Sequence, residues 1–168
     1  MTPDTDLDTP YRAGPGTNWT ALLTLVQDSF AYMEARIDPP SSMHRLTADS
    51  IARHAAAQEI WIVGPQDAPI ACLFMTEKPD CLYVGKLAVA AGHRGRGHAR
   101  RLIDCAETRA KEKGLPALEL QSRVELTENH AAFAKMGFIK TGEDAHAGYD
   151  RPTSITMRRG IGRIGDTL

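Results

Sequence analysis

The sequence has few cysteines, no long apolar run and almost no net charge, and each shortage excludes a class of protein. Its three cysteines, Cys72, Cys81 and Cys105, form neither an even set for disulfides nor a Cys-x-x-Cys pair. This usage favours a reducing, cytoplasmic compartment over a secreted disulfide framework. No stretch approaches the roughly 18 apolar residues of a membrane-spanning helix. The acidic start of the chain also lacks an apolar signal region, so we expect no membrane partner.

Patterns for nucleic acid and metal binding are equally scarce. The 20 basic and 21 acidic residues give a formal net charge of -1, so no overall field attracts nucleic acid. The chain also lacks an aromatic-basic platform of the kind that binds RNA. Its six histidines show neither a His-Glu-x-x-His motif nor paired Cys/His spacing. We therefore expect no nucleic-acid partner and no metal.

The chain has 168 residues, 42% of them hydrophobic, which is enough for one domain with a substantial core. We expect loose tails at residues 1–10 and 161–168 around a domain at residues 11–160. Hydrophobic periodicity and turn residues predict the elements of that domain. In chain order they are a short strand at 11–13, helices at 20–36 and from 47 to beyond 55, strands at 60–63, 70–75 and 82–89, a helix at 99–113, a strand at 117–121, a helix at 129–136, and two final antiparallel strands.

These elements predict an α+β fold. Short turn clusters separate the strands before residue 90, which is typical of an antiparallel meander. The segment 82–120 instead reads as strand, helix and strand, and the crossover helix implies that its two strands are parallel. We expect one domain with a central mixed, mostly antiparallel sheet and flanking helices.

A basic, glycine-rich stretch, "HRGRGHARR" at residues 93–101, lies where the strand at 82–89 leads into the following helix. A helix N-terminus presents unpaired N–H groups, glycines allow close approach to the backbone, and arginines add donors for phosphate oxygens. The P-loop pattern is missing, and Arg100 stands where a Rossmann fingerprint needs its third glycine. We expect this turn to bind a diphosphate; a solvated helix start is the alternative.

The same stretch resembles the pyrophosphate-binding motif of the GNAT superfamily of N-acetyltransferases. Arg94, Gly97 and Ala99 match the pattern Arg/Gln-x-x-Gly-x-Gly/Ala, and a buried strand precedes them. The segment 129–138, "NHAAFAKMGF", resembles the fourth helix of that family. The order of the elements agrees as well, so the resemblance covers about residues 10–160.

The resemblance implies a fold whose fourth and fifth strands splay apart and hold the co-substrate acetyl-coenzyme A. The backbone of Leu87, Ala88 and Val89 would bind the pantetheine arm. The other cofactor-binding residues implied by position are Arg94, Gly95, Arg96, Gly97, His98, Ala99, Arg100, Asn129 and Phe133. Asn129 is also a candidate N-cap of its helix.

The implied chemistry is direct attack of a primary amine on the thioester in a ternary complex. The amine has to lose a proton, and the departing thiolate benefits from an acid. Many relatives supply that acid from a tyrosine, but the matching position here is Phe133, which has no proton to give. Tyr83 on the fourth strand and Tyr149 in the last loop are the candidate catalytic residues.

The acceptor is the least defined part of the prediction. Glu34, Asp38 and His146 lie in segments that border the acceptor site in the family, and the two carboxylates would favour a cationic amine. We expect a small-molecule amine. The alternatives are a protein or peptide acceptor, or a coenzyme A-binding or sensing module without catalysis. A homodimer is the default assembly.

Overall fold

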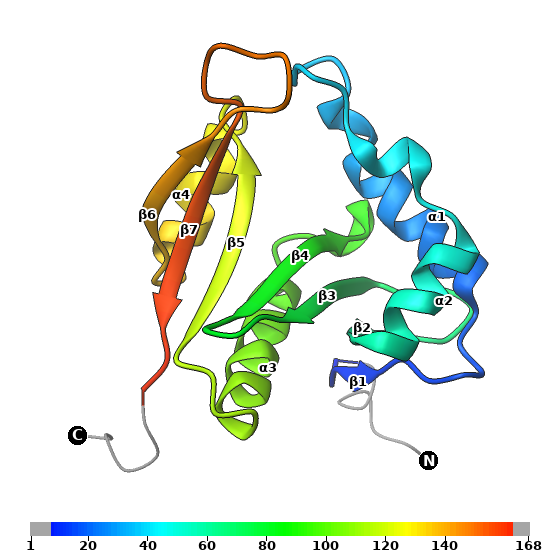
Figure 1. The fold of residues 1–168 in the computed structure, drawn as a ribbon. Helices are drawn as coiled ribbons and strands as arrows, with labels where there is room; N and C mark the ends of the chain where they lie inside the picture. The colour runs from blue at the N-terminus through cyan, green and yellow to red at the C-terminus, as the bar shows by residue number, and fades with distance from the viewer. Residues whose placement is uncertain (1–7, 163–168) are drawn as a thin grey trace.

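The computed structural model describes residues 8–162 of the chain. The predicted tails fall mainly on residues 1–7 and 163–168, which lie outside the described residues, so the domain boundaries stay predictions. Figure 1 shows the elements. They are β1 (Tyr11–Arg12), α1 (Trp19–Phe30), η2 (Ala31–Met33), η3 (Ser42–Arg45), α2 (Ala48–Ala57), β2 (Glu59–Val63), β3 (Ala71–Glu77), β4 (Leu82–Val89), η4 (Ala91–His93), α3 (His98–Glu112), β5 (Ala117–Arg123), α4 (Thr127–Lys135), β6 (Ile139–Asp144) and β7 (Ser154–Gly160), where η marks a 3-10 turn.

The described strands form one sheet in the order β1-β2-β3-β4-β5-β7-β6. Its neighbouring strands are antiparallel except β4 and β5, the parallel pair predicted on either side of α3. That pair is short: Leu82 lies opposite Leu118 and Tyr83 opposite Glu119, and the strands then diverge (Figure 1). The fold is therefore the mixed, mostly antiparallel sheet expected, with splayed fourth and fifth strands.

Helices cover both faces of the sheet (Figure 1). The apolar stripe of α3, including Leu102 and Ile103, is buried with Leu118 and Phe138 on one face. On the other face, α1 and α2 enclose a second core that includes Leu22. Each fully buried side chain of this kind contributes roughly 1.5–3 kcal/mol. Within residues 8–162, none of the helices combines the length and apolar character needed to cross a bilayer.

The first long helix is shorter than its sequence pattern predicts. A helix was expected at 20–36, but α1 ends at Phe30 and a 3-10 turn follows. Met33 and Ile37 leave the line of the helix to bury their side chains with Leu126, which precedes α4. The apolar pattern in the sequence therefore continues past Phe30, because Met33 and Ile37 are apolar in order to pack against Leu126 and not to continue the helix. The expected cap of α2 is confirmed, since Thr47 accepts a hydrogen bond from the backbone of Ser50.

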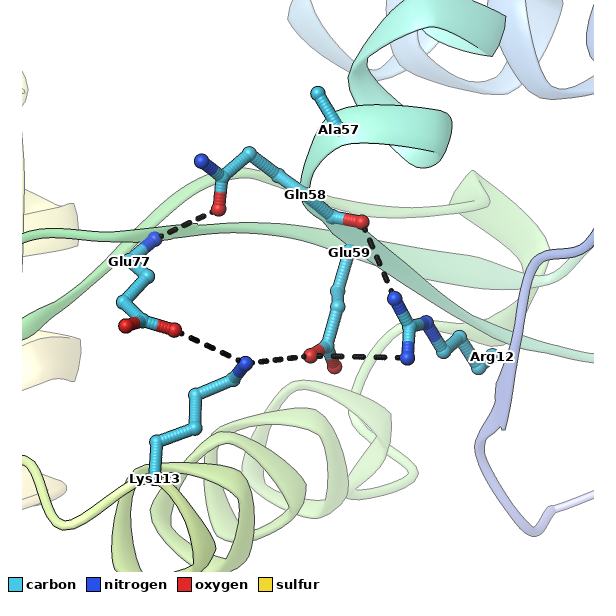
Figure 2. A pocket seen from close by; sticks show the side chains of 6 residues that line it. All are labelled: Arg12, Ala57, Gln58, Glu59, Glu77 and Lys113. Carbon is cyan, nitrogen blue, oxygen red and sulfur yellow. Dashed lines mark hydrogen bonds and ion pairs between the residues drawn. The ribbon is translucent and has the colours of Figure 1, made fainter.

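A hollow of about 270 Å³ opens near β1, far from the gap between β4 and β5. Figure 2 shows its lining residues, which are Arg12, Ala57, Gln58, Glu59, Glu77 and Lys113. The ammonium of Lys113 contacts Glu59 at 3.1 Å and Glu77 at 3.2 Å. Its charged groups are thus paired with one another, and the hollow belongs to the framework of the fold.

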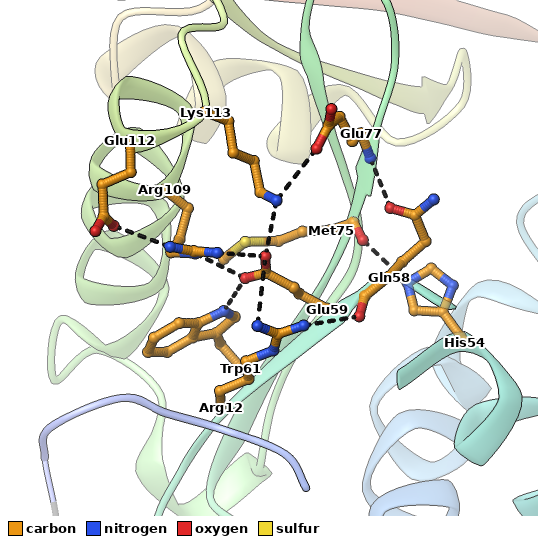
Figure 3. A network of polar contacts seen from close by, with 10 residues as sticks. All are labelled: Arg12, His54, Gln58, Glu59, Trp61, Met75, Glu77, Arg109, Glu112 and Lys113. Atoms are coloured by element: carbon orange, nitrogen blue, oxygen red, sulfur yellow. Dashed lines mark hydrogen bonds and ion pairs between the residues drawn. The ribbon is translucent and has the colours of Figure 1, made fainter. Parts of the chain in front are cut away.

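The carboxylate of Glu59 is the centre of this polar network (Figure 3). Arg109 of α3 donates to its two oxygens at 2.8 Å and 2.6 Å, and the indole of Trp61 donates at 2.8 Å. These donors, Arg109 above all, lower the pKa of Glu59 to about 2. Because Glu59 starts β2 and Arg109 lies on α3, the network fixes the C-terminal half of α3 against the sheet.

Candidate active site

The opening between β4 and β5 leads into a groove of about 1420 Å³. One wall comes from β4 and the turn into α3, and the other from β5 and α4. The loops after α1 and after β6 complete the lining. Pockets for one small ligand usually measure roughly 300–1,000 Å³, so this groove has room for two.

The turn from β4 into α3 has the backbone of an anion cradle. Gly95 and Gly97 have φ angles of +76° and +83°, a conformation that residues with a Cβ rarely adopt. Gly97 is the N-cap of α3, whose first N–H groups lack partners within the helix. A Cβ at Gly95 would meet nothing within 4 Å, so the backbone is open to an approaching ligand. These features fit a diphosphate.

The basic side chains of this turn differ in position: some line the groove and others contact the turn itself. Arg94 and Arg100 line the groove, whereas Arg96 is not among the lining residues. The guanidinium of Arg101 donates to the carbonyl of Arg96 at 2.9 Å and lies 3.2 Å from Nδ1 of His98. The side chain of His98 is buried, and that burial lowers its pKa. Arg101, which the sequence analysis left out, therefore holds the turn together.

Leu87, Ala88 and Val89 line the groove along the edge where β4 has left β5. On its other side the strand is fixed, because Ala88 and Val89 pair with β3. A strand held on one side and free on the other can accept an extended ligand as an added strand. The predicted pantetheine-binding residues thus have a suitable backbone.

The helix α4 brings Asn129 and Phe133 to the groove. The ring of Phe133 also packs edge-on against Phe138, with 5.9 Å between centroids. α4 begins at Thr127, two residues earlier than expected, and Leu126 occupies the N-cap position. The N-cap interpretation of Asn129 was wrong, because its N–H donates to the carbonyl of Leu126 inside the first turn.

Tyr83 lies at the apex of the opening, at the last pair that β4 makes with β5. Its side chain lines the groove, and Nζ of Lys78 lies 4.5 Å from the ring centroid. Burial raises the pKa of the phenol above 10, and the negative charge of Glu119 adds to the effect. At neutral pH the hydroxyl is therefore protonated, so it can serve as an acid but not as a base.

Polar contacts join the loop after α1 to the loop after β6. The hydroxyl of Tyr149 donates to Oδ1 of Asp38 at 2.6 Å, and Arg151 donates to Oδ2 at 3.2 Å. Arg123, at the end of β5, donates to two carbonyls of the first loop at 2.7 Å and 3.1 Å. In Figure 1 the two loops meet above the gap between β5 and α1. These residues are termed the bridge below: Asp38, Pro39, Pro40, Arg123, Tyr149 and Arg151.

The three residues expected at the acceptor site have different surroundings. His146 lines the groove, and its ring nitrogen Nδ1 contacts the hydroxyl of Thr153. Glu34 is not among the lining residues; its carboxylate lies 2.8 Å from Nε2 of His44. Asp38 is not among them either; its carboxylate accepts hydrogen bonds from Tyr149 and Arg151. Neither carboxylate behind the expectation of a cationic acceptor is part of the lining, and the acceptor stays a prediction.

Four arginines and lysines that the sequence analysis missed line the groove: Arg45, Lys86, Arg123 and Lys135. Lys86 carried a signal in the sequence, as the one charged residue in the strand "LYVGKLAV". Arg45 and Arg123 reach the groove through contacts between segments far apart in the chain, which no local pattern reports.

Comparison with known families identifies the family of the chain. The profile of the Acetyltransferase (GNAT) family matches residues 19–138. The chain belongs to this family. As a GNAT protein it is an N-acetyltransferase that transfers an acyl group from acetyl-coenzyme A. Among curated proteins, no significant match to the chain is found.

Solved GNAT structures share the fold. The ribosomal-protein-S18-alanine N-acetyltransferase of Escherichia coli aligns with a TM-score of 0.67 and 16% identity, over 95% of this chain and 97% of that one. A GNAT acetyltransferase of Staphylococcus aureus Mu50 gives 0.71 and 12%, over 92% and 99%. A chain of the NatC complex, solved with a Gag peptide and coenzyme A, gives 0.63 and 17%, over 92% and 98%.

Proposed function

We propose that this GNAT enzyme acetylates the primary amine of a small molecule by direct attack in a ternary complex. The observation that carries the proposal is one continuous groove, lined by the glycine turn, the free edge of β4 and Tyr83, and extending to the bridge. A groove with room for both substrates supports direct transfer, because the reacting atoms can be held together.

The proposed donor site occupies the part of the groove beside β4 and α3. N–H groups from Gly95 to Ala99 bind the diphosphate, with Arg94 and Arg100 adding positive charge. The backbone of Leu87, Ala88 and Val89 binds the pantetheine arm. Asn129 and Phe133 contact that arm from α4. Arg96 and His98 contribute through the backbone of the turn. The side chain of Arg96 is not part of the lining, and that of His98 contacts Arg101.

The proposed reaction needs one deprotonation and one protonation. The amine loses a proton to water, and its nitrogen forms a C–N bond to the acetyl carbon while the C–S bond breaks. The sulfur leaves as a thiolate and is protonated, so that the net products are the amide and the free thiol. Tyr83 is the proposed acid, because its raised pKa keeps the proton in place until the thiolate forms. Tyr149 is not assigned a proton transfer, because its hydroxyl is bonded to Asp38.

The bridge supports a small acceptor over a polypeptide. It ties the two loops that line the groove, so a long chain cannot enter laterally between them. The named E. coli structure shares the fold, and its name gives an alanine of ribosomal protein S18 as the acceptor, so a polypeptide acceptor is the alternative. The other candidate function is a coenzyme A-binding module without catalysis. Phe133 favours it, because this residue has no proton to give and occupies the position where many relatives have an acidic tyrosine.

We also propose a cytoplasmic location and a homodimer. The three cysteines are unpaired thiols, as a reducing compartment requires. β6 is an edge strand of the sheet and carries Ile139, which is 68% exposed; a second copy of the chain can pair with such an edge. Light scattering during size-exclusion chromatography measures the mass of the wild type and of Ile139→Lys. A dimeric mass that the variant leaves unchanged would contradict an interface at β6.

A matched pair of glycine variants tests the donor site. Gly97→Glu places a side chain and a negative charge in the proposed diphosphate cradle, so calorimetry should detect no coenzyme A binding. Gly114→Glu is the control, because Gly114 also has a positive φ, of +71°, but lies at the other end of α3. It should bind coenzyme A as the wild type does. Equal binding by both variants would show that the cradle lies elsewhere.

Turnover decides between the enzyme and the module. Amines, amino acids, aminoglycosides and peptides are offered with acetyl-coenzyme A, and the released thiol is measured. Turnover of a small amine supports the proposal, whereas preferential turnover of peptides supports the polypeptide alternative. Coenzyme A binding without turnover of any acceptor supports the module.

A further inference from the structure

The charges that line the groove are strongly unequal. Among the described lining residues, Glu128 is the only carboxylate, and its oxygen lies 2.8 Å from the guanidinium of Arg36. Six arginines and lysines line the same groove: Arg45, Lys86, Arg94, Arg100, Arg123 and Lys135. The groove is therefore built for negative charge.

The proposed donor accounts for only part of this positive charge. Arg94 and Arg100 flank the glycine turn, and Lys135 lies on α4 two residues after Phe133. These three belong to the elements that would hold coenzyme A. The other three come from elements outside the donor motif: Arg45 from η3, Lys86 from β4 before the pantetheine segment, and Arg123 from the end of β5.

Lys86 is the most constrained of the three. Its backbone has a φ of +51°, the only positive φ of a described residue other than glycine. It lies beside an irregularity in the pairing of β3 with β4, between Cys72 and Phe74 on β3. Its side chain is half-buried, and Nζ lies 5.3 Å from the centroid of Phe74. A lysine in a left-handed conformation is strained, which suggests that its placement serves a function.

Within residues 8–162, no carboxylate forms an ion pair with Arg45, Lys86 or Arg123. The hydrogen bonds of Arg123 go to the carbonyls of Pro39 and Pro40, which are uncharged. A half-buried ammonium without an anion is costly, and burial lowers the pKa of Lys86 accordingly.

The position of Lys86 along β4 relates it to the reacting end of the donor. If the diphosphate lies at 95–99 and the pantetheine arm along 87–89, the arm runs toward the start of β4. The thioester then comes beside Lys86 and Tyr83. An anion held by Lys86 would thus be near the reacting amine and far from the phosphates.

We propose that the acceptor is a small amine that bears a carboxylate, and that Lys86 binds this carboxylate. Arg45 and Arg123 line the same groove and add to its positive charge. The inference rests on the proposed function and narrows its substrate class. It replaces the expectation of a cationic acceptor, because Glu34 and Asp38 are paired outside the lining.

Matched acceptors test the carboxylate directly. L-Phenylalanine, L-leucine and L-methionine are compared with the amines that result from removing the α-carboxylate, and β-alanine is compared with ethylamine. We expect kcat/KM to be about 10- to 100-fold higher for at least one carboxylate member, as for other contacts between charged groups. Equal or higher values for all the decarboxylated amines, or no reaction of any carboxylate, would overturn the proposal.

Variants of Lys86 connect the preference to the residue. Lys86→Met should raise KM for the preferred carboxylate by about 10-fold or more and leave the decarboxylated amine unaffected. Lys86→Arg should restore part of the preference. The control is Lys140→Met, because Lys140 pairs with Glu143 on the exposed β6 and does not line the groove. A loss of kcat for both acceptors in Lys86→Met would contradict carboxylate binding.

The two proposals can fail separately. Calorimetry with coenzyme A is run on each variant and on the wild type. Binding and turnover without a carboxylate preference would remove this inference and keep the proposed function. Absence of coenzyme A binding to the wild type would remove both.

Discussion

The hydroxyl of Tyr149 donates a 2.6 Å hydrogen bond to Asp38, although 111 positions of the chain separate them. The contact joins a loop next to η2 to the loop between β6 and β7, and the two loops meet in Figure 1. The same carboxylate accepts from Arg151 at Oδ2. The contact thus connects two loops whose residues Pro39 and Tyr149 line the groove.

Tyr149→Phe should weaken acceptor binding with little effect on stability. Its partner Asp38 is exposed, so the free energy of unfolding should change little. KM for the acceptor should rise about 3- to 10-fold, because the loops lose their connection, whereas KM for acetyl-coenzyme A should not change. Steady-state kinetics and hydrogen exchange in residues 34–41 and 145–152 measure both effects. Tyr11→Phe, which loses a bond to the carbonyl of Gly64, is the control and should keep the wild-type KM.

Tyr83→Phe should reduce turnover without weakening donor binding. The phenol is the proposed acid, and such a proton donor typically contributes about 100-fold or more to the rate. The raised pKa of Tyr83 keeps it protonated through neutral pH, so kcat of the wild type should not fall on its account until the pH exceeds 10. Single-turnover rates measure the chemical step, and calorimetry with coenzyme A measures donor binding. An unchanged rate would assign Tyr83 to packing alone.

Glu59→Gln should destabilise the protein by about 3 kcal/mol, because it removes the charge that Arg109 and Lys113 surround. The pKa of Glu59 is about 2 in the folded protein against an ordinary 4.5. The carboxylate therefore stabilises the fold fully above about pH 4.5, and this contribution declines as the pH falls toward 2. Urea unfolding from pH 7 to pH 3 should show a steeper loss for the wild type than for Glu59→Gln. Parallel curves would contradict the pairing.

The three thiols should resist alkylation in the folded enzyme. Burial raises the pKa of Cys72 to about 12 and of Cys105 to about 11, and it also raises that of Cys81. At pH 8 the thiolate fraction of Cys105 is then about one in a thousand. Iodoacetamide at pH 8, followed by mass spectrometry, should add no label to the native protein and three labels in urea. Activity should survive the native treatment, and rapid labelling of Cys105 would contradict its burial.

The order of strands and helices could be predicted because each element carries its own period or turn signal. The helix cap at Thr47 and the glycines of the β4–α3 turn are local features of this kind. The family resemblance extended the prediction to the splayed strands, which no periodicity reports. Local patterns were sufficient where a residue's neighbours in the chain are also its neighbours in space.

The rest of the site depends on contacts between distant residues. α1 ends early because Met33 packs with Leu126, which lies 93 positions later in the chain. The sequence predicted Asp38 as an acceptor-binding carboxylate, and only the fold shows that Tyr149 donates a hydrogen bond to it. Lys86 is visible as a charge within an apolar strand, but its left-handed backbone and lack of a counter-ion emerge only from the fold.

The divergence of β4 from β5 leaves two strand edges without protein partners in the middle of the sheet. Unpaired edges are usually sites of aggregation, since a strand from another molecule can add to them. The bridge joins a loop that precedes α2 to the loop between β6 and β7. We therefore expect it also to shield these inner strand edges from a strand of another molecule.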